Sequence, residues 1–174
     1  MALSREPTLR VVDEERIEMT MEAEYSARAL RAKAFFEQGY NCCQAVLLAF
    51  DDMTGLDHET ATKLAAGFGG GIGRLREVCG TFTGACMALD LISGSADPNE
   101  KESKSQLYAR IQEMARQFAQ DNGSYICRDL LNLTEKKSSP TPADRTPEYY
   151  KKRPCSEMCA YSAQLLENLL LEQK

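Results

Sequence analysis

Apolar positions recur along most of this chain at the spacing of amphipathic helices. Residues 13 to 38 are rich in Glu, Ala, Arg and Met, contain neither Gly nor Pro, and carry an apolar stripe in their C-terminal half. Gly39 follows as a helix stop signal, so we expect one long helix over this segment. No segment shows the alternation of β-branched and polar residues that is typical of strands.

Capping residues divide the remainder into further helices. Asn41 and Asp57 are suitable N-caps, and Pro98 suits the first turn of a helix. The segment from 80 to 92 is apolar with little charge, which predicts a helix buried on most sides. The predicted helices cover residues 13–38, 42–53, 58–66, 80–92, 98–121, 127–131 and the chain from about 154 onward.

Two loops separate these helices. Residues 67–74 are rich in glycine but match neither the dinucleotide nor the Walker pattern, so they suit close backbone packing or the approach of N–H groups to a buried anionic site. Residues 134–153 hold three prolines and predict a long loop before the last helix. We therefore expect an all-α fold, a compact single-domain bundle of five to seven helices over residues 13–174, after a flexible tail at residues 1–12.

Composition narrows the classes of function. The net charge of −5 argues against a nucleic-acid partner, and we interpret the basic clusters at residues 136–137 and 151–153 as solvated loop charge. No signal peptide is evident, and no apolar stretch is long enough to span a bilayer, so we expect a cytoplasmic protein without a membrane partner. The apolar helices are compatible with a homodimer.

Seven cysteines in 174 residues indicate metal or redox chemistry, because a reducing compartment offers no structural disulfides. Cys42, Cys79 and Cys155 stand at predicted helix starts and Cys127 near a fourth, where the helix dipole lowers a thiol pKa. We interpret the three others as small buried apolar residues: Cys43, Cys86 and Cys159.

Other residues limit the chemistry further. His58 is the only histidine, which excludes sites that need two from one chain, and the absence of C-x-x-C disfavours thioredoxin-type dithiols and zinc ribbons. Gly80 and Gly84 share a helix face, which allows another helix to come close. Arg74 and Arg76, beside the glycine-rich loop, favour salt bridges over pairing with an anionic centre.

Five segments follow one another in a characteristic order: residues 39–46, 68–71, 79–84, 123–127 and the cysteine that opens the last helix. By their order and spacing the chain resembles, from residue 28 to residue 172, the C_GCAxxG_C_C family of redox-active proteins. The four family cysteines fall on Cys42, Cys79, Cys127 and Cys155. Thr81 replaces the usual alanine and adds a hydroxyl near the site. Cys43 and Cys159 are additional to the family pattern.

The resemblance implies redox character rather than a defined reaction. The family is distantly similar to the cluster-bearing part of split-Soret-type cytochromes, and only that part transfers here, because the chain lacks the C-x-x-C-H haem-attachment motif. We expect an iron–sulfur cluster of undetermined type bound by Cys42, Cys79, Cys127 and Cys155. Such a protein would act in electron transfer or redox sensing with an unidentified partner protein, rather than as a turnover enzyme.

Two redox or metal-binding alternatives remain from the residues alone, beside a helical interaction domain whose cysteines only fill the core. In the first, the chain is a thiol–disulfide redox protein, with Cys42 or Cys79 as the low-pKa thiol and a facing cysteine as its partner. In the second, the same thiols hold zinc or copper(I).

Overall fold

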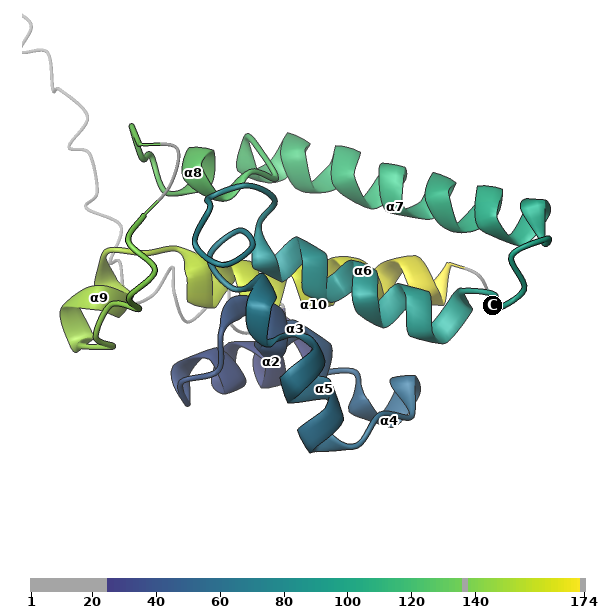
Figure 1. The fold of residues 1–174 in the computed structure, drawn as a ribbon, viewed down its shortest axis with the longest axis horizontal. Coiled ribbons are helices and arrows are strands. Elements are labelled where there is room, and N and C mark those ends of the chain that lie inside the picture. The colour runs from purple at the N-terminus through teal and green to yellow at the C-terminus, as the bar shows by residue number, and fades with distance from the viewer. Residues whose placement is uncertain (1–24, 136–137, 173–174) are drawn as a thin grey trace, which may run out of the picture.

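The computed structural model describes residues 25–135 and 138–172, and these residues form a helical bundle (Figure 1). Within them there are nine α-helices and no strand beyond one isolated bridge, which confirms the all-α prediction. The elements are α2 (Ala27–Glu37), α3 (Cys42–Leu48), α4 (Asp51–Thr54), α5 (His58–Leu64), the 3-10 turn η1 (Ala66–Phe68), α6 (Gly80–Ser93), α7 (Lys101–Asn122), α8 (Cys127–Leu130), α9 (Pro147–Lys151) and α10 (Cys155–Leu171).

Helix α3 is the centre of the bundle. Its residues Cys43 and 45–48 are fully buried, as is Phe50 just beyond its end. Asn41 caps it, and the side chain of Gln44 completes a capping box by accepting from the Asn41 N–H. Helices α2, α6 and α10 surround α3, and α10 packs most extensively against α2.

Helices α6, α7 and α10 lie side by side along the long axis of the molecule (Figure 1). Aromatic rings connect them. The ring centroid of Phe82 in α6 lies 5.7 Å from that of Phe118 in α7, which lies 5.5 Å from the ring centroid of Tyr161 in α10. Only Met114 and Phe118 of α7 are buried, so this helix covers the bundle from one side.

Two glycines allow α3 and α6 to come close, as the sequence predicts. A Cβ on Gly80 would lie 2.5 Å from the Cys42 sulfur, and one on Gly84 would lie 2.6 Å from the carbonyl oxygen of Cys43. Real Cβ atoms essentially never approach so closely, so the spacing of these two helices requires glycine at both positions.

Several helix boundaries differ from the prediction. Helix α2 begins only at Ala27, because Ser26 is extended and its hydroxyl caps the helix; residues 13–24 and the predicted tail at 1–12 lie outside the described residues. The predicted helix over 42–53 is divided into α3 and α4 at Phe50, which fills the core. Helix α7 begins at Lys101 rather than at Pro98, because the Asp97 side chain accepts from the Asn99 N–H and holds a turn.

The proline-containing loop before α10 holds one short helix. Thr146 caps α9, which has Pro147 in its first turn. Helices α4 and α9 are thus the single-turn additions to the seven predicted segments. In the described part of the chain, no helix is both long enough and apolar enough to cross a bilayer.

Candidate functional site

Four helix N-termini meet at one cavity of about 300 Å³. Cys42 is the first residue of α3, Cys127 of α8 and Cys155 of α10, while Cys79 is the N-cap of α6. All four sulfur-bearing side chains line this cavity, although they are up to 113 positions apart in the sequence. The structure therefore brings together the four cysteines that the sequence analysis singled out.

A short antiparallel pairing holds two of these cysteines side by side. Val78 forms the isolated bridge with Ile126. On either side of it, the Cys79 N–H donates to the Tyr125 carbonyl at 2.9 Å, and the Cys127 N–H donates to the Glu77 carbonyl at 2.7 Å. The segment that leads into α6 is thereby fixed to the segment that leads into α8.

Burial is the largest influence on the pKa values of three of these thiols in the metal-free chain, and it raises them. It raises the pKa of Cys42 and of Cys155 to about 11, and that of Cys79 to about 12. The proximity of the other cavity thiols raises these pKa values further, because adjacent thiolates repel each other. The expectation that the helix start lowers the pKa of Cys79 is therefore wrong, since desolvation outweighs the helix dipole.

Two of the sulfurs receive hydrogen bonds. The backbone N–H groups of Gly70 and Cys43 act on Cys42 and lower its pKa against the effect of burial. The hydroxyl of Thr81 lies 3.2 Å from the Cys79 sulfur, so this side chain contacts the site. Hydrogen bonds to sulfur stabilise thiolates and tune the potentials of thiolate-bound metal centres.

The other two sulfurs have arginines beside them. The Arg76 guanidinium lies with Nη1 3.8 Å from the Cys127 sulfur. The charges of Arg153 and Arg145 act on Cys155 and lower its pKa, against the larger effect of burial. Each of the four cavity cysteines thus has its own donor or cation.

The glycine-rich loop and Arg76 just after it supply two of these contacts through left-handed backbone. These are the Gly70 N–H at Cys42 and the Arg76 guanidinium at Cys127. Positive φ angles run through five consecutive residues: Gly70, Gly71, Ile72, Gly73 and Arg74. Arg76 follows with φ of 64°, and a Cβ on Gly71 would lie 2.7 Å from the Cys127 Cβ. Left-handed backbone costs about 1–2 kcal/mol for each residue other than glycine, so this loop is held in place by its surroundings.

In the described part of the chain, no aspartate or glutamate lines the cavity, but four arginines do: Arg74, Arg76, Arg145 and Arg153. Arg76 is only 3% exposed, and its Nε donates to the Ser138 hydroxyl at 2.8 Å. Among the described residues, no carboxylate forms a salt bridge with Arg74 or Arg76, so the salt bridges that the sequence favoured are not found there. A buried guanidinium is costly without a counter-charge, which makes this cavity suited to anionic contents.

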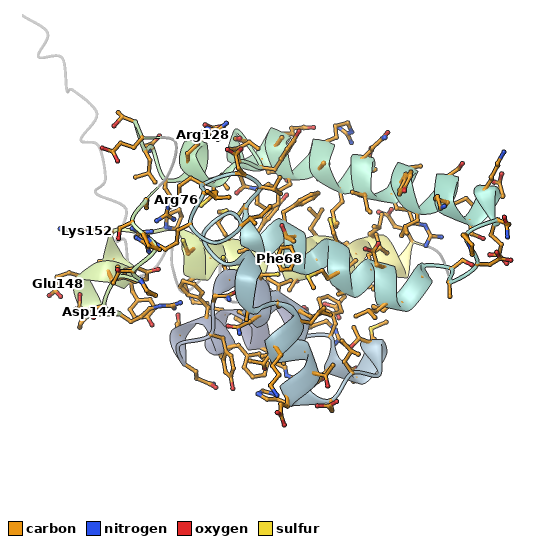
Figure 2. The ribbon with its side chains drawn as sticks, in the orientation of Figure 1. Phe68, Arg76, Arg128, Asp144, Glu148 and Lys152 are labelled. Carbon is orange, nitrogen blue, oxygen red and sulfur yellow. The ribbon has the colours of Figure 1, made fainter. Side chains whose placement is uncertain are left out.

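Figure 2 shows Arg76 beside α8, with Asp144 and Glu148 at the outer edge of the molecule near α9. Both of these acidic residues are exposed, and neither lines the cavity. The positive charge of the cavity is therefore not compensated from this neighbouring loop.

Sequence reasoning missed two arginines of the cavity. Arg153 belongs to a basic cluster that reads as solvated loop charge, and Arg145 lies in the proline-containing loop. In the structure both guanidinium groups stack on the Tyr149 ring, at 4.9 Å and 5.4 Å from its centroid. Two arginines close to a tyrosine in a proline-containing segment were the one sequence signal that could have indicated this part of the cavity.

The remaining cysteines do not line the cavity. Cys43 and Cys159 are fully buried in the core, as expected of small apolar residues, and Cys43 contacts the Met87 sulfur at 3.6 Å. Cys86 is half-buried on α6. All seven cysteines are free. Among the described residues, no group of three or more His, Cys, Asp or Glu side chains is close enough together to hold one metal ion.

The sequence also matches a known family model. Residues 40–169, which are most of the chain, match the model described as "Putative redox-active protein (C_GCAxxG_C_C)". No curated protein and no solved structure matches the chain. Because the matched region contains all four cavity cysteines and the glycine-rich loop, the chain belongs to the C_GCAxxG_C_C family.

Proposed function

We propose that this protein binds an iron–sulfur cluster through Cys42, Cys79, Cys127 and Cys155 and acts in electron transfer or redox sensing. The observation that carries the proposal is that all four cysteines, each at the beginning of a helix, line one cavity. Four cysteine thiolates are the common ligand set of such clusters, which supply one-electron chemistry when bound.

The spacing of the thiols favours a cluster over a single ion. Tetrahedral zinc holds its four thiolates about 3.8 Å apart, given zinc–sulfur bonds of about 2.3 Å. The four thiols line a cavity of about 300 Å³, and among the described residues no three of them are close enough together to hold one metal ion. A cluster places several metal ions between its thiolates, so it suits thiols that are spread around a cavity.

The charges of the surroundings support the same proposal. Ligand thiols must lose their protons, and burial opposes this loss at Cys42, Cys79 and Cys155. The Gly70 N–H acts against this cost at Cys42, the Thr81 hydroxyl does so at Cys79, and the charges of Arg153 and Arg145 do so at Cys155. The Arg76 guanidinium lies beside the fourth sulfur, that of Cys127. These contacts favour negative charge on the sulfurs that would ligate the cluster, although burial has the larger effect at the first three.

The test is metal analysis of the full chain purified without oxygen. Iron, sulfide, zinc and copper are counted, and a visible spectrum is recorded before and after reduction. We expect iron and sulfide with an absorption that bleaches on reduction. Colourless, metal-free protein after anaerobic reconstitution would contradict the proposal, whereas zinc or copper alone would replace the cluster by a simple thiolate site.

Cysteine variants give the matched comparison. Alanine at any of the four cavity cysteines should lower the iron content sharply, because each supplies one ligand. Cys86→Ala and Cys159→Ala remove thiols that do not line the cavity, so both should keep the iron of the parent protein. Equal iron content in Cys42→Ala and Cys159→Ala would contradict the assignment of ligands.

A further inference from the structure

Positive charge gathers around the thiol cavity, partly on the wall that residues 140–154 form. Arg145 and Arg153 both stack on Tyr149, and Arg74 lies on the same cavity. Burial lowers the pKa of Arg74 most, and the charges of Arg76 and Arg153 lower it further, so these guanidinium groups are close enough to repel each other. Such a gathering of like charges is unfavourable unless an anion shares the space.

A bound cluster would balance this charge only in part. The metal ions of a cluster are cationic, so a site with four thiolate ligands has less negative charge than the thiolates alone. Among the described residues, no carboxylate lines the cavity, whereas four arginines do.

Three of the arginines have donors to spare. A guanidinium carries five N–H donors. Arg145 donates through Nη1 to the Phe36 carbonyl at 2.9 Å and through Nη2 to the Tyr40 carbonyl at 3.0 Å, which anchors it in place. Arg74 donates through Nε to the Ser139 carbonyl. The remaining donors of these half-buried groups are suited to a planar or tetrahedral oxyanion, which arginine binds with two parallel hydrogen bonds.

We propose that Arg74, Arg145 and Arg153 form a binding site for a small oxyanion, a phosphate or carboxylate group, beside the thiols of the cavity. This site goes beyond the proposed function, because the arginines carry it with or without a cluster. With the cluster present, the oxyanion lies in the same cavity as the four ligand cysteines, so a molecule that bears it is placed for electron exchange or for sensing at that centre.

Inorganic phosphate is the probe for the test. The full-length protein, both metal-free and after anaerobic reconstitution, is titrated by calorimetry at constant ionic strength in chloride. We expect saturable binding of one phosphate per chain in both forms. Arg74→Gln and Arg153→Gln should each weaken it about tenfold, because each removes charge-assisted hydrogen bonds. Far-UV circular dichroism checks that each variant is folded.

The matched control is Arg116→Gln on α7, since Arg116 is exposed and pairs with Glu113 away from the cavity. Its phosphate affinity should equal that of the parent protein. Absence of saturable binding in both forms, or affinities in the two cavity variants equal to that of Arg116→Gln, would overturn the inference. Phosphate binding by a protein that takes up no iron would support this site while contradicting the cluster, and iron uptake without phosphate binding would do the reverse.

Discussion

The Arg76 guanidinium lies against the Cys127 sulfur, with Nη1 and Sγ 3.8 Å apart, in a cavity lined by no carboxylate of residues 25–135 and 138–172. Arg76 is buried and has a left-handed backbone, with φ of 64°. A charged side chain in a strained conformation is retained only where its surroundings favour it. The sulfur of Cys127 is the neighbour that can become anionic, so this contact connects the glycine-rich loop to the chemistry of the cavity.

Replacement of Arg76 tests the electrostatic effect of this contact. In the reconstituted protein, Arg76→Gln should lower the reduction potential by an amount on the order of tens of millivolts, because reduction adds negative charge that the guanidinium stabilises. A potentiometric titration followed by visible absorption measures the shift. Arg128→Gln is the control, since Arg128 follows Cys127 in the sequence but pairs with Glu77 at 3.0 Å. A potential that stays equal or rises in Arg76→Gln would contradict this role.

Gly80→Ala should destabilise the protein strongly. The new Cβ would lie 2.5 Å from the Cys42 sulfur and 2.9 Å from the Phe68 carbonyl oxygen, so α3 and α6 must separate. We expect a loss of about 1–3 kcal/mol in the free energy of unfolding, measured by urea denaturation. Gly67→Ala is the control because a Cβ there meets nothing within 4 Å. Equal stability of the two variants would show that the helices do not depend on this close approach.

Asn41→Ala should cost more stability than loss of an ordinary helix cap. The Asn41 side chain caps α3 through Oδ1, and its Nδ2 donates to the carbonyls of Ala65 and Ala66. Removal of a cap alone costs about 1 kcal/mol. Asp57→Ala removes the exposed cap of α5 and serves as the comparison. In urea denaturation, Asn41→Ala should have a lower free energy of unfolding than Asp57→Ala. The reverse order would mean that the Nδ2 contacts contribute nothing to stability.

The raised thiol pKa values predict slow alkylation of the folded, metal-free protein. Burial raises the pKa of Cys42 and Cys155 to about 11 from an ordinary value of 9.0. The folded chain therefore keeps these protons when the unfolded chain loses them. Their contribution to stability is fully present below pH 9 and is lost as the pH rises toward about 11.

Iodoacetamide labelling, read peptide by peptide in a mass spectrometer across this pH range, measures the effect. The midpoint of labelling at Cys42 should be about two pH units higher in the native protein than in urea, as the shift in its pKa implies. A native midpoint at or below the unfolded one would contradict the prediction and would favour the thiol–disulfide alternative.

Local sequence signals determined the positions of the ligand candidates. Asn41 starts α3 and places Cys42 in its first turn, and Gly80 and Gly84 indicated the close contact of α6 with a neighbour. Capping and helix-face periodicity act over four residues or fewer, so they can be read from the chain without knowledge of the fold. For the same reason, the sequence alone predicts that these cysteines stand at helix starts, although it does not predict the cavity.

Only the tertiary structure decided what surrounds those cysteines. Burial, which raises the pKa of Cys79 to about 12 where the helix dipole alone predicted a lower value, is a property of the packed bundle. The left-handed conformation of Arg76 brings its guanidinium to Cys127, which is 51 residues away in the sequence. The position of Arg153 at the cavity depends on its contact with the Tyr149 ring. Desolvation and charge act through space, and the sequence order of residues does not reveal which of them share a cavity.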